Sequence, residues 1–117
     1  MEKIEETGAK VADCVFCKIA AGEISSRKVH RAEGAVVSFL DANPKAPGHT
    51  LVIPVAHHPW FQDMPNQLSD TLFREAKRIA QELKAEYAAD FIKLRIDGLD
   101  IPHVHIHLIP SKFNPKV

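Results

Sequence analysis

The feature that most constrains the fold is a segment near the C-terminus, 103–110, in which histidine alternates with aliphatic residues. Successive side chains of a β-strand point to opposite faces, so the alternation predicts a strand with an apolar face and an imidazole face. The apolar positions are Val104, Ile106 and Leu108, and the histidines are His103, His105 and His107. The three rings would follow one another at roughly 6.6 Å. We expect Pro110 to end the strand, because proline cannot donate to a ladder.

The chain of 117 residues is 45% hydrophobic, enough for one domain with its own core. We expect a flexible N-terminal tail at 1–12, charged and without the apolar segment of a signal peptide, and a single domain at 13–117. Fifteen basic and fifteen acidic side chains balance, which argues against binding to nucleic acid or an anionic membrane. No apolar run reaches the roughly 18 residues of a membrane span. We therefore expect a soluble, cytoplasmic protein.

Apolar spacing along the chain predicts an α+β domain. A short helix should begin near the cysteines and end at Gly22, and a long amphipathic helix should cover 68–87. An extended segment is expected at 24–30, and strands are expected at 35–40, 49–53, 91–96 and 103–109. The order lacks the repeated βαβ alternation of parallel sheets, so we predict an antiparallel sheet.

Three histidines on one strand face allow three interpretations. They could bind a metal, since neutral imidazole is a common zinc ligand. One ring could instead be a nucleophile assisted by its neighbours, because imidazole near neutral pH is mostly uncharged and nucleophilic. Attack on phosphorus suits such a group, since neighbouring donors stabilise charge on the non-bridging oxygens. The third interpretation is an exposed face without function, which lysine, threonine or glutamate would serve equally well.

The two cysteines, Cys14 and Cys17, have the C-x2-C spacing that lets two thiolates hold one tetrahedral zinc ion. In a reducing compartment this spacing indicates metal or redox chemistry more than a structural disulfide. A dithiol redox pair is the alternative, which the lack of a following βαβ pattern disfavours. A zinc ion would need two further ligands from elsewhere in the chain.

Taken together, these motifs resemble the histidine triad (HIT) superfamily of nucleotide hydrolases and transferases. The segment 103–109 resembles the family signature H-x-H-x-H, with hydrophobic residues between the histidines. The segments 14–24, 39–41 and 47–57 resemble further family motifs and follow in the same order. The resemblance implies a HIT-like fold, with an antiparallel five-stranded sheet, one short N-terminal helix and one long amphipathic helix, assembled as a homodimer.

The resemblance also implies a role for each candidate residue toward a purine nucleotide substrate. His105 would attack the α-phosphorus and carry the nucleotidyl group. His107 and His49 would bind the phosphate oxygens, while His103 would help to orient the ring of His105. Asp41 would accept hydrogen bonds from the ribose hydroxyls. The apolar positions that match the family's slot for the base are Phe16, Ile19, Ile24 and Phe39, for which simple core packing is the alternative.

The missing zinc ligands are likewise implied by the resemblance. Related bacterial proteins often bind zinc through such a cysteine pair, the histidine that follows the central strand and the first histidine of the triad. The implied ligands are Cys14, Cys17, His57 and His103, with His58 as the alternative to His57. Four protein ligands leave no open position for water, so this zinc would be structural.

One loop departs from the family pattern. Members of the Hint branch carry Asn and Gly-Gln or Gly-Gln-Ser before the triad, and these groups touch the α-phosphate and the leaving group. The corresponding loop here, 96–102, is shorter and has neither Asn nor Gln. Asp100 is a candidate partner for a leaving amine, with a solvated loop acid as the alternative.

The predicted function is hydrolysis or transfer at the α-phosphate of purine nucleoside phosphoramidates, or related nucleotidyl substrates, through a covalent nucleotidyl-histidine. The shortened loop favours amine leaving groups over polyphosphate ones. The alternatives are a dinucleoside polyphosphate hydrolase and a catalytically weak, nucleotide-binding interaction protein.

Overall fold

The computed structural model describes residues 13–98 and 101–113, so the expected tail at 1–12 lies outside the described residues. Within this part of the chain, five strands form one antiparallel sheet in the order β1-β2-β3-β5-β4. The strands are β1 (His30–Ala32), β2 (Val36–Leu40), β3 (Thr50–Pro54), β4 (Phe91–Arg95) and β5 (Ile106–Ser111). The helices are α2 (Val15–Ala20), the 3-10 helix η1 (Phe61–Asp63) and α3 (Asn66–Glu86). The predicted α+β, antiparallel architecture is confirmed.

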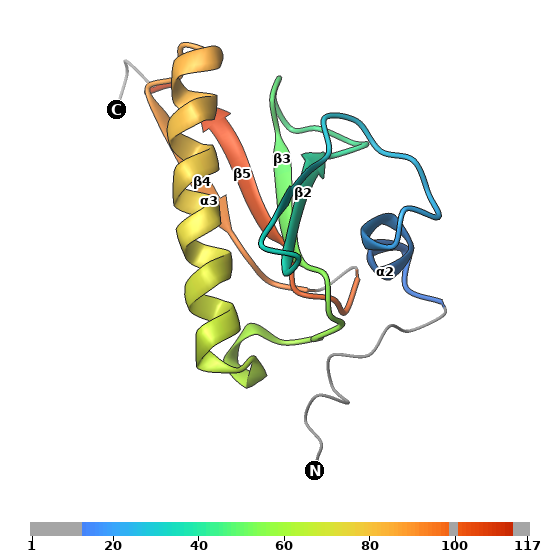
Figure 1. Ribbon diagram of the computed structural model, residues 1–117. Coiled ribbons are helices and arrows are strands. Elements are labelled where there is room, and N and C mark those ends of the chain that lie inside the picture. The colour runs from blue at the N-terminus through green and yellow to red at the C-terminus, as the bar shows by residue number, and fades with distance from the viewer. Residues whose placement is uncertain (1–12, 99–100, 114–117) are drawn as a thin grey trace.

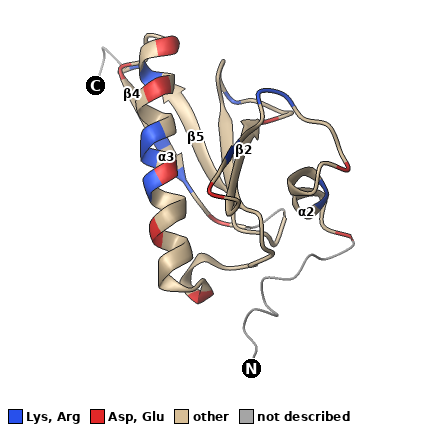
Figure 2. Cartoon of the chain, in the orientation of Figure 1, with Lys and Arg blue, Asp and Glu red and all other residues tan. Residues whose placement is uncertain are grey.

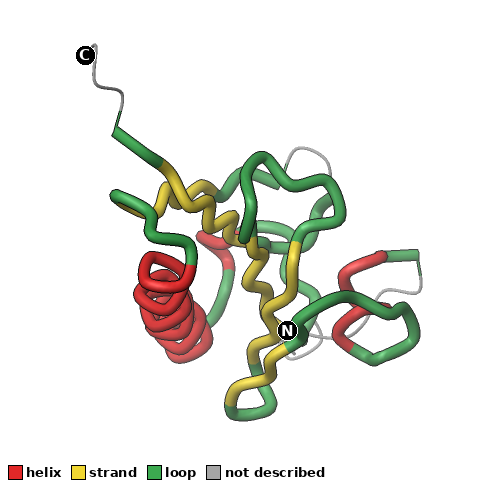
Figure 3. The backbone as a smooth tube through the Cα atoms, turned by 90° about the horizontal axis from the view of Figure 1, so that it is seen from above, coloured by secondary structure: helices red, strands yellow, loops and turns green. Residues whose placement is uncertain are grey.

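The two helices cover opposite faces of the sheet (Figures 1 and 3). The core under α3 contains the apolar side chains predicted for one face of the histidine segment, Val104, Ile106 and Leu108. The core on the α2 side contains residues of that helix together with alternate residues of β2 and β3. The alternation along 103–108 therefore separates a packing face from a face that looks toward α2.

The long helix α3 buries the apolar stripe that its sequence predicts. Its buried residues are Thr71, Leu72, Ala76, Ile79 and Leu83, and they follow the spacing of three and four that puts side chains on one face. Charged residues of both signs occupy other positions along α3 (Figure 2). Exposed ion pairs contribute little, so burial of the stripe is what holds α3 on the sheet. No helix in the described ranges is long and apolar enough to cross a membrane.

The boundaries of the histidine strand differ from the prediction. Pro110 lies inside β5, opposite Ile92 of β4, and does not end the strand. Pairing between β5 and β3 stops at Leu108. No residue of β3 lies opposite Pro110, so the missing N–H of the proline leaves no carbonyl of β3 without a donor. The segment enters the regular ladder only at Ile106, so His103 and His105 precede the strand.

The first strand also begins later than expected. The extended segment predicted for 24–30 becomes a strand only at His30. Lys28 has a positive φ of 52°, which interrupts an extended run. Three residues, 33–35, then join the paired residues Ala32 and Val36. Glu33 and Gly34 both have positive φ and form the centre of a turn that the N–H of Ala35 closes by donating to the carbonyl of Ala32.

Gly48 packs against Tyr87, the residue that follows α3, and directly precedes His49. Its φ is +86°, and a Cβ atom at this position would lie 2.5 Å from Cε2 of Tyr87. Only a residue without a side chain can follow this path over the Tyr87 ring. The next residue is His49, so the contact fixes where His49 enters the sheet.

We expect Gly48→Ala to lower the free energy of unfolding by more than about 2 kcal/mol, because it combines backbone strain with a collision against Tyr87. The matched control is Gly34→Ala, where φ is also positive but no atom lies within 4 Å of the added Cβ. Its loss should be about 1 kcal/mol, from backbone strain alone. Urea denaturation of both variants measures the difference, and equal losses would contradict a role for the Tyr87 contact.

Candidate functional site

A cavity of about 560 Å³ lies between α2 and the sheet. The four residues predicted to form the base slot all line it: Phe16, Ile19, Ile24 and Phe39. The polar residues predicted for the ribose and phosphate line it as well: Asp41, His49, His105 and His107. The structure thus brings the predicted nucleotide-binding residues, which come from separate segments, into one cavity. Their individual roles stay predictions.

Phe16 joins the apolar end of the cavity to the histidines. Its ring centroid lies 5.9 Å from that of Phe39 and 5.0 Å from that of His105. The short helix that carries Phe16 is capped by Cys14, whose Sγ accepts from the N–H of Cys17. The cysteine pair therefore sets the position of a ring that contacts the central histidine.

A backbone hydrogen bond fixes the tautomer of His105. Its Nδ1 atom lies 2.8 Å from the carbonyl oxygen of His103. A carbonyl can only accept, so Nδ1 carries a proton and donates it. In the neutral ring the lone pair is then on Nε2, which is the atom that a nucleophilic attack requires. The contact that relates His103 to the orientation of His105 is thus one of its main chain, and the predicted role itself stays a prediction.

His49 and His107 form a second hydrogen-bonded chain. The backbone N–H of Lys45 donates to Nδ1 of His49 at 3.0 Å, so the neutral His49 ring carries its proton on Nε2. That Nε2 atom lies 3.0 Å from Nδ1 of His107 and donates to it. The neutral His107 ring must therefore carry its own proton on Nε2. This N–H group is a donor suited to a phosphate oxygen or a leaving group.

Asp41 lies against the same two rings. Its Oδ2 atom is 3.4 Å from Nε2 of His49 and 3.9 Å from Nδ1 of His107. Its other oxygen accepts from the backbone N–H of Asn43 at 2.9 Å. One ligand atom from each of Asp41, His49 and His107 lies within 4.8 Å of the others. The hydrogen bond between the two rings occupies the nitrogens concerned, so we interpret the group as a relay and not as a metal site.

Arg95 is a cavity residue that the sequence did not single out. It lies opposite His107 across β4 and β5 and lines the cavity. Its Nε atom is 3.4 Å from Oδ2 of Asp97. Of the described lining residues, only Arg95 and Lys45 are basic. Sequence spacing could not reveal this placement, because it depends on the register between two strands.

Burial keeps two histidines of the cavity, His107 and His49, uncharged. It lowers the pKa of His107 to about 4, and positive charge on His105, Arg95 and His49 adds to the effect. The pKa of His49 is also lowered, chiefly by burial. At neutral pH both rings are therefore hydrogen-bond partners without charge, and Arg95 and Lys45 are the cationic side chains that line the cavity.

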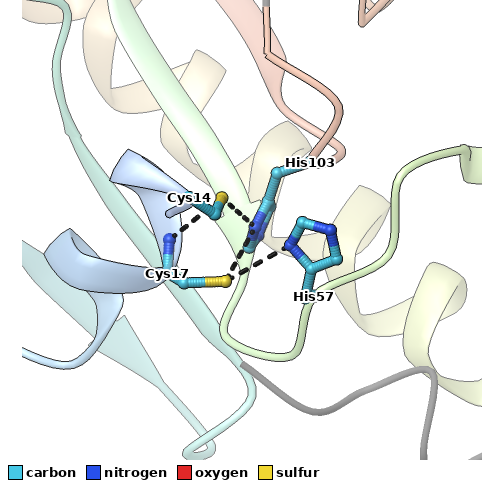
Figure 4. A group of neighbouring side chains, drawn as sticks. All are labelled: Cys14, Cys17, His57 and His103. Atoms are coloured by element: carbon cyan, nitrogen blue, oxygen red, sulfur yellow. Dashed lines mark hydrogen bonds between the residues drawn. The ribbon is translucent and has the colours of Figure 1, made fainter. Parts of the chain in front are cut away.

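Four side chains from three segments converge outside the cavity (Figure 4). Cys14 and Cys17 come from the start of α2, His57 follows β3, and His103 precedes β5. The distance from Sγ to Nδ1 is 3.3 Å for Cys14 and His103, 3.5 Å for Cys17 and His103, and 3.3 Å for Cys17 and His57. Tetrahedral bonds of about 2.3 Å to sulfur and about 2.0 Å to nitrogen would separate these atoms by about 3.5 Å. The predicted set fits a zinc ion.

The tautomer of His103 fits the same conclusion. Its Nε2 atom donates to the carbonyl oxygen of Pro54 at 2.9 Å, so the Nδ1 lone pair points to the sulfurs. Burial lowers the pKa of His103 to about 4, which keeps the ring neutral, as a metal ligand must be. His58, the alternative ligand, is not among the converging side chains, and its carbonyl accepts from the N–H of Val104.

Comparison with known proteins agrees with this geometry. The HIT domain family matches residues 21–114 of the sequence. The chain belongs to the HIT family. An uncharacterised HIT-like protein from Methanocaldococcus jannaschii is 37% identical over 102 residues, which cover 83% of this chain and 78% of that protein. The crystal structure of a HIT family protein from Bacillus anthracis superimposes with a TM-score of 0.82, at 33% identity, over 90% of this chain and 77% of the other.

Some relatives of this HIT protein are named for an activity, among them an adenylylsulfatase of Arabidopsis thaliana that is 32% identical over 105 residues, which cover 86% of this chain and 53% of that enzyme. The adenosine 5′-monophosphoramidase of Saccharomyces cerevisiae is 36% identical over 102 residues, which cover 86% of this chain and 64% of the yeast enzyme. The family to which the chain belongs therefore includes nucleotide hydrolases. Asp100, the loop acid considered for the leaving group, lies outside the described residues.

We expect this HIT protein to lose stability as the pH falls from about 6.5 to about 4. His107 has a pKa of about 4 when folded, against an ordinary value of 6.5, so the unfolded chain binds more protons in this window. The contribution of His107 to this loss should be at most about 3 kcal/mol, and His103, whose pKa is lowered to about 4 as well, adds to the total. Urea denaturation between pH 7 and pH 4.5 measures it. His107→Gln should reduce the change of unfolding free energy with pH, and the control His30→Gln, in exposed β1, should leave it as in wild type. An equal change with pH in wild type and His107→Gln would contradict the assignment.

Proposed function

We propose that this protein hydrolyses purine nucleoside 5′-phosphoramidates, or transfers their nucleotidyl group, through a covalent adduct on His105. The observation that carries the proposal is the hydrogen bond that Nδ1 of His105 donates to the carbonyl of His103. With the proton on Nδ1, the Nε2 atom keeps its lone pair and can attack. The similarity to a yeast adenosine 5′-monophosphoramidase supports the same class of substrate.

The cavity offers a separate environment for each part of the nucleotide. The purine would lie between the apolar side chains around Phe16 and Phe39, where a flat ring buries its faces. The ribose would approach Asp41, whose carboxylate can accept from hydroxyl groups. The α-phosphate would lie at His107 and His49, with Arg95 balancing its negative charge.

The reaction then has two steps. Nε2 of His105 attacks the α-phosphorus, the bond from phosphorus to nitrogen breaks, and its electron pair stays with the leaving amine. That amine takes a proton from Nε2 of His107, while His49 donates to Nδ1 of the same ring. A water molecule next attacks the phosphorus and displaces His105, and the proton that this water loses returns to Nε2 of His107. The products are the nucleoside monophosphate and the enzyme in its starting protonation state.

A second candidate function is cleavage of dinucleoside polyphosphates. Arg95 favours it, because a guanidinium that lines the cavity could hold an anionic leaving phosphate. The carboxylates of Asp41 and Asp97 oppose it by repulsion. An amine leaving group meets no such repulsion, so we rank the phosphoramidate first.

We expect wild-type protein to release AMP from adenosine 5′-phosphoramidate faster than from diadenosine tetraphosphate. His105→Ala should lower turnover by at least about a hundredfold, because no other ring in the cavity has a free Nε2 lone pair. His30→Ala, in exposed β1, is the matched control and should retain wild-type turnover. Chromatographic measurement of AMP decides the matter. Undiminished turnover in His105→Ala, or none in wild type, would contradict the proposal.

We also propose that Cys14, Cys17, His57 and His103 bind a structural zinc ion. The distances and the His103 tautomer support this, and the four ligands would leave no position for substrate. The ion would tie the start of α2 to the residue whose carbonyl holds His105.

Elemental analysis of protein purified without added zinc should find about one ion per chain. His57→Asn should remove it and lower the melting temperature, because the neighbouring ligands would lose a partner. The control is His58→Asn, which changes the adjacent buried histidine outside the cluster and should keep the metal. A fully folded wild-type protein without metal would refute the site.

We further propose that the protein is a homodimer. In the sheet order β4 is an outer strand, and its Phe91 and Leu94 are exposed, at 38% and 49%. An apolar outer strand favours association with a second copy. The expected cytoplasmic location stays a prediction.

A further inference from the structure

A second cavity lies beside His105. It has a volume of about 190 Å³ and lies between the segment before α3 and the residues that follow β4. His105 lines both this cavity and the larger one, so the proposed nucleophile stands where the two meet. None of the roles assigned above to the base, ribose, phosphate or zinc occupies this second space.

Two aromatic side chains form its outer wall. Trp60 is 44% exposed and Phe61 is 49% exposed, and both line the cavity. Neither belongs to the buried core clusters. Large aromatic surfaces left in water next to a reactive group are typical of a binding site, because stacking on a ligand buries them.

The Trp60 ring packs against the backbone at Gly98. Gly98 has a φ of +87°, and a Cβ atom there would lie 3.2 Å from Cζ3 of Trp60. The indole therefore rests against backbone that only glycine provides this closely. Ile96 and Val104 add apolar surface to the lining. The result is an apolar slot with one aromatic wall fixed by the backbone.

Charge distinguishes the two cavities. Arg95 lines the larger cavity and Asp97 lines the smaller one, and their side chains form an ion pair at 3.4 Å. The guanidinium is thus on the side where a phosphate would bind, and the carboxylate is on the side of the aromatic slot. A carboxylate repels an anionic group and tolerates a neutral or cationic one.

We propose that the second cavity binds the leaving group of the substrate, and that this group is a primary alkylamine with an aromatic ring on its chain, attached through its nitrogen to the α-phosphorus. The proposal rests on the proposed function. When the bond from phosphorus to nitrogen breaks and the nitrogen takes its proton from His107, the free primary amine gains a further proton from solvent, since its pKa is about 10. The resulting ammonium group leaves past Asp97, whose charge is opposite.

Two substrates test the cavity: adenosine 5′-phosphoramidate and its N-(2-phenylethyl) derivative. Wild type should show a kcat/KM about three- to tenfold higher for the derivative, the gain expected from one aromatic stacking contact. Trp60→Ala should reduce that ratio to about one. The control is Phe73→Ala, which removes an exposed aromatic ring of α3 outside both cavities and should keep the wild-type ratio.

A binding experiment tests the same site without turnover. Trp60 is the single tryptophan of the chain, so its fluorescence reports on this cavity alone. In the His105→Ala variant, an N-(2-(4-nitrophenyl)ethyl) phosphoramidate of adenosine should quench the tryptophan strongly, because nitroaromatic rings quench indole on contact. AMP, which lacks the amine substituent, should quench it little.

The two experiments separate this inference from the proposed function. If wild type hydrolyses neither substrate, the proposed function fails, while tryptophan quenching still decides whether the cavity binds the aromatic group. If wild type hydrolyses both with equal kcat/KM, if Trp60→Ala keeps the preference, or if the nitrophenyl compound quenches no more than AMP, the second cavity is not the leaving-group site.

Discussion

The backbone carbonyl of His103 is the group on which the candidate site depends. It accepts the Nδ1 proton of His105 and so decides which nitrogen of that ring keeps a lone pair. The side chain of the same residue turns away, toward Cys14 and Cys17, while its Nε2 donates to Pro54. The side chain of His103 therefore belongs to the proposed zinc ligands, and its main chain holds the proposed nucleophile in orientation.

Burial and hydrogen bonding act together on the remaining histidines. Desolvation lowers the pKa values of His49 and His107, so both rings are neutral in the folded protein at pH 7. Each ring then has one N–H that can donate a hydrogen bond. The N–H of Lys45 then imposes one direction on the chain through His49 to His107. A neutral relay cannot compensate a phosphate by itself, which explains why Arg95 at the same face matters for a nucleotide.

Much of this arrangement could be predicted from local patterns, since alternation and spacing determine faces. The two faces of 103–108, the stripe of α3 and the antiparallel sheet followed from periodicity alone. The register between distant strands does not follow from periodicity. The sequence therefore does not single out Arg95, which lies opposite His107, and the expectation that Pro110 ends the strand is wrong. Trp60 lies in a segment without hydrophobic periodicity, so only the fold shows that its ring packs against Gly98.

The most direct test of this account is the protonation of the imidazole nitrogens at pH 7, measured by long-range proton–nitrogen-15 correlation spectra of the folded protein. The account predicts that His105 carries its proton on Nδ1, whereas His49 and His107 carry theirs on Nε2. A proton on Nε2 of His105 would contradict it, because the nitrogen proposed to attack phosphorus would then have no lone pair.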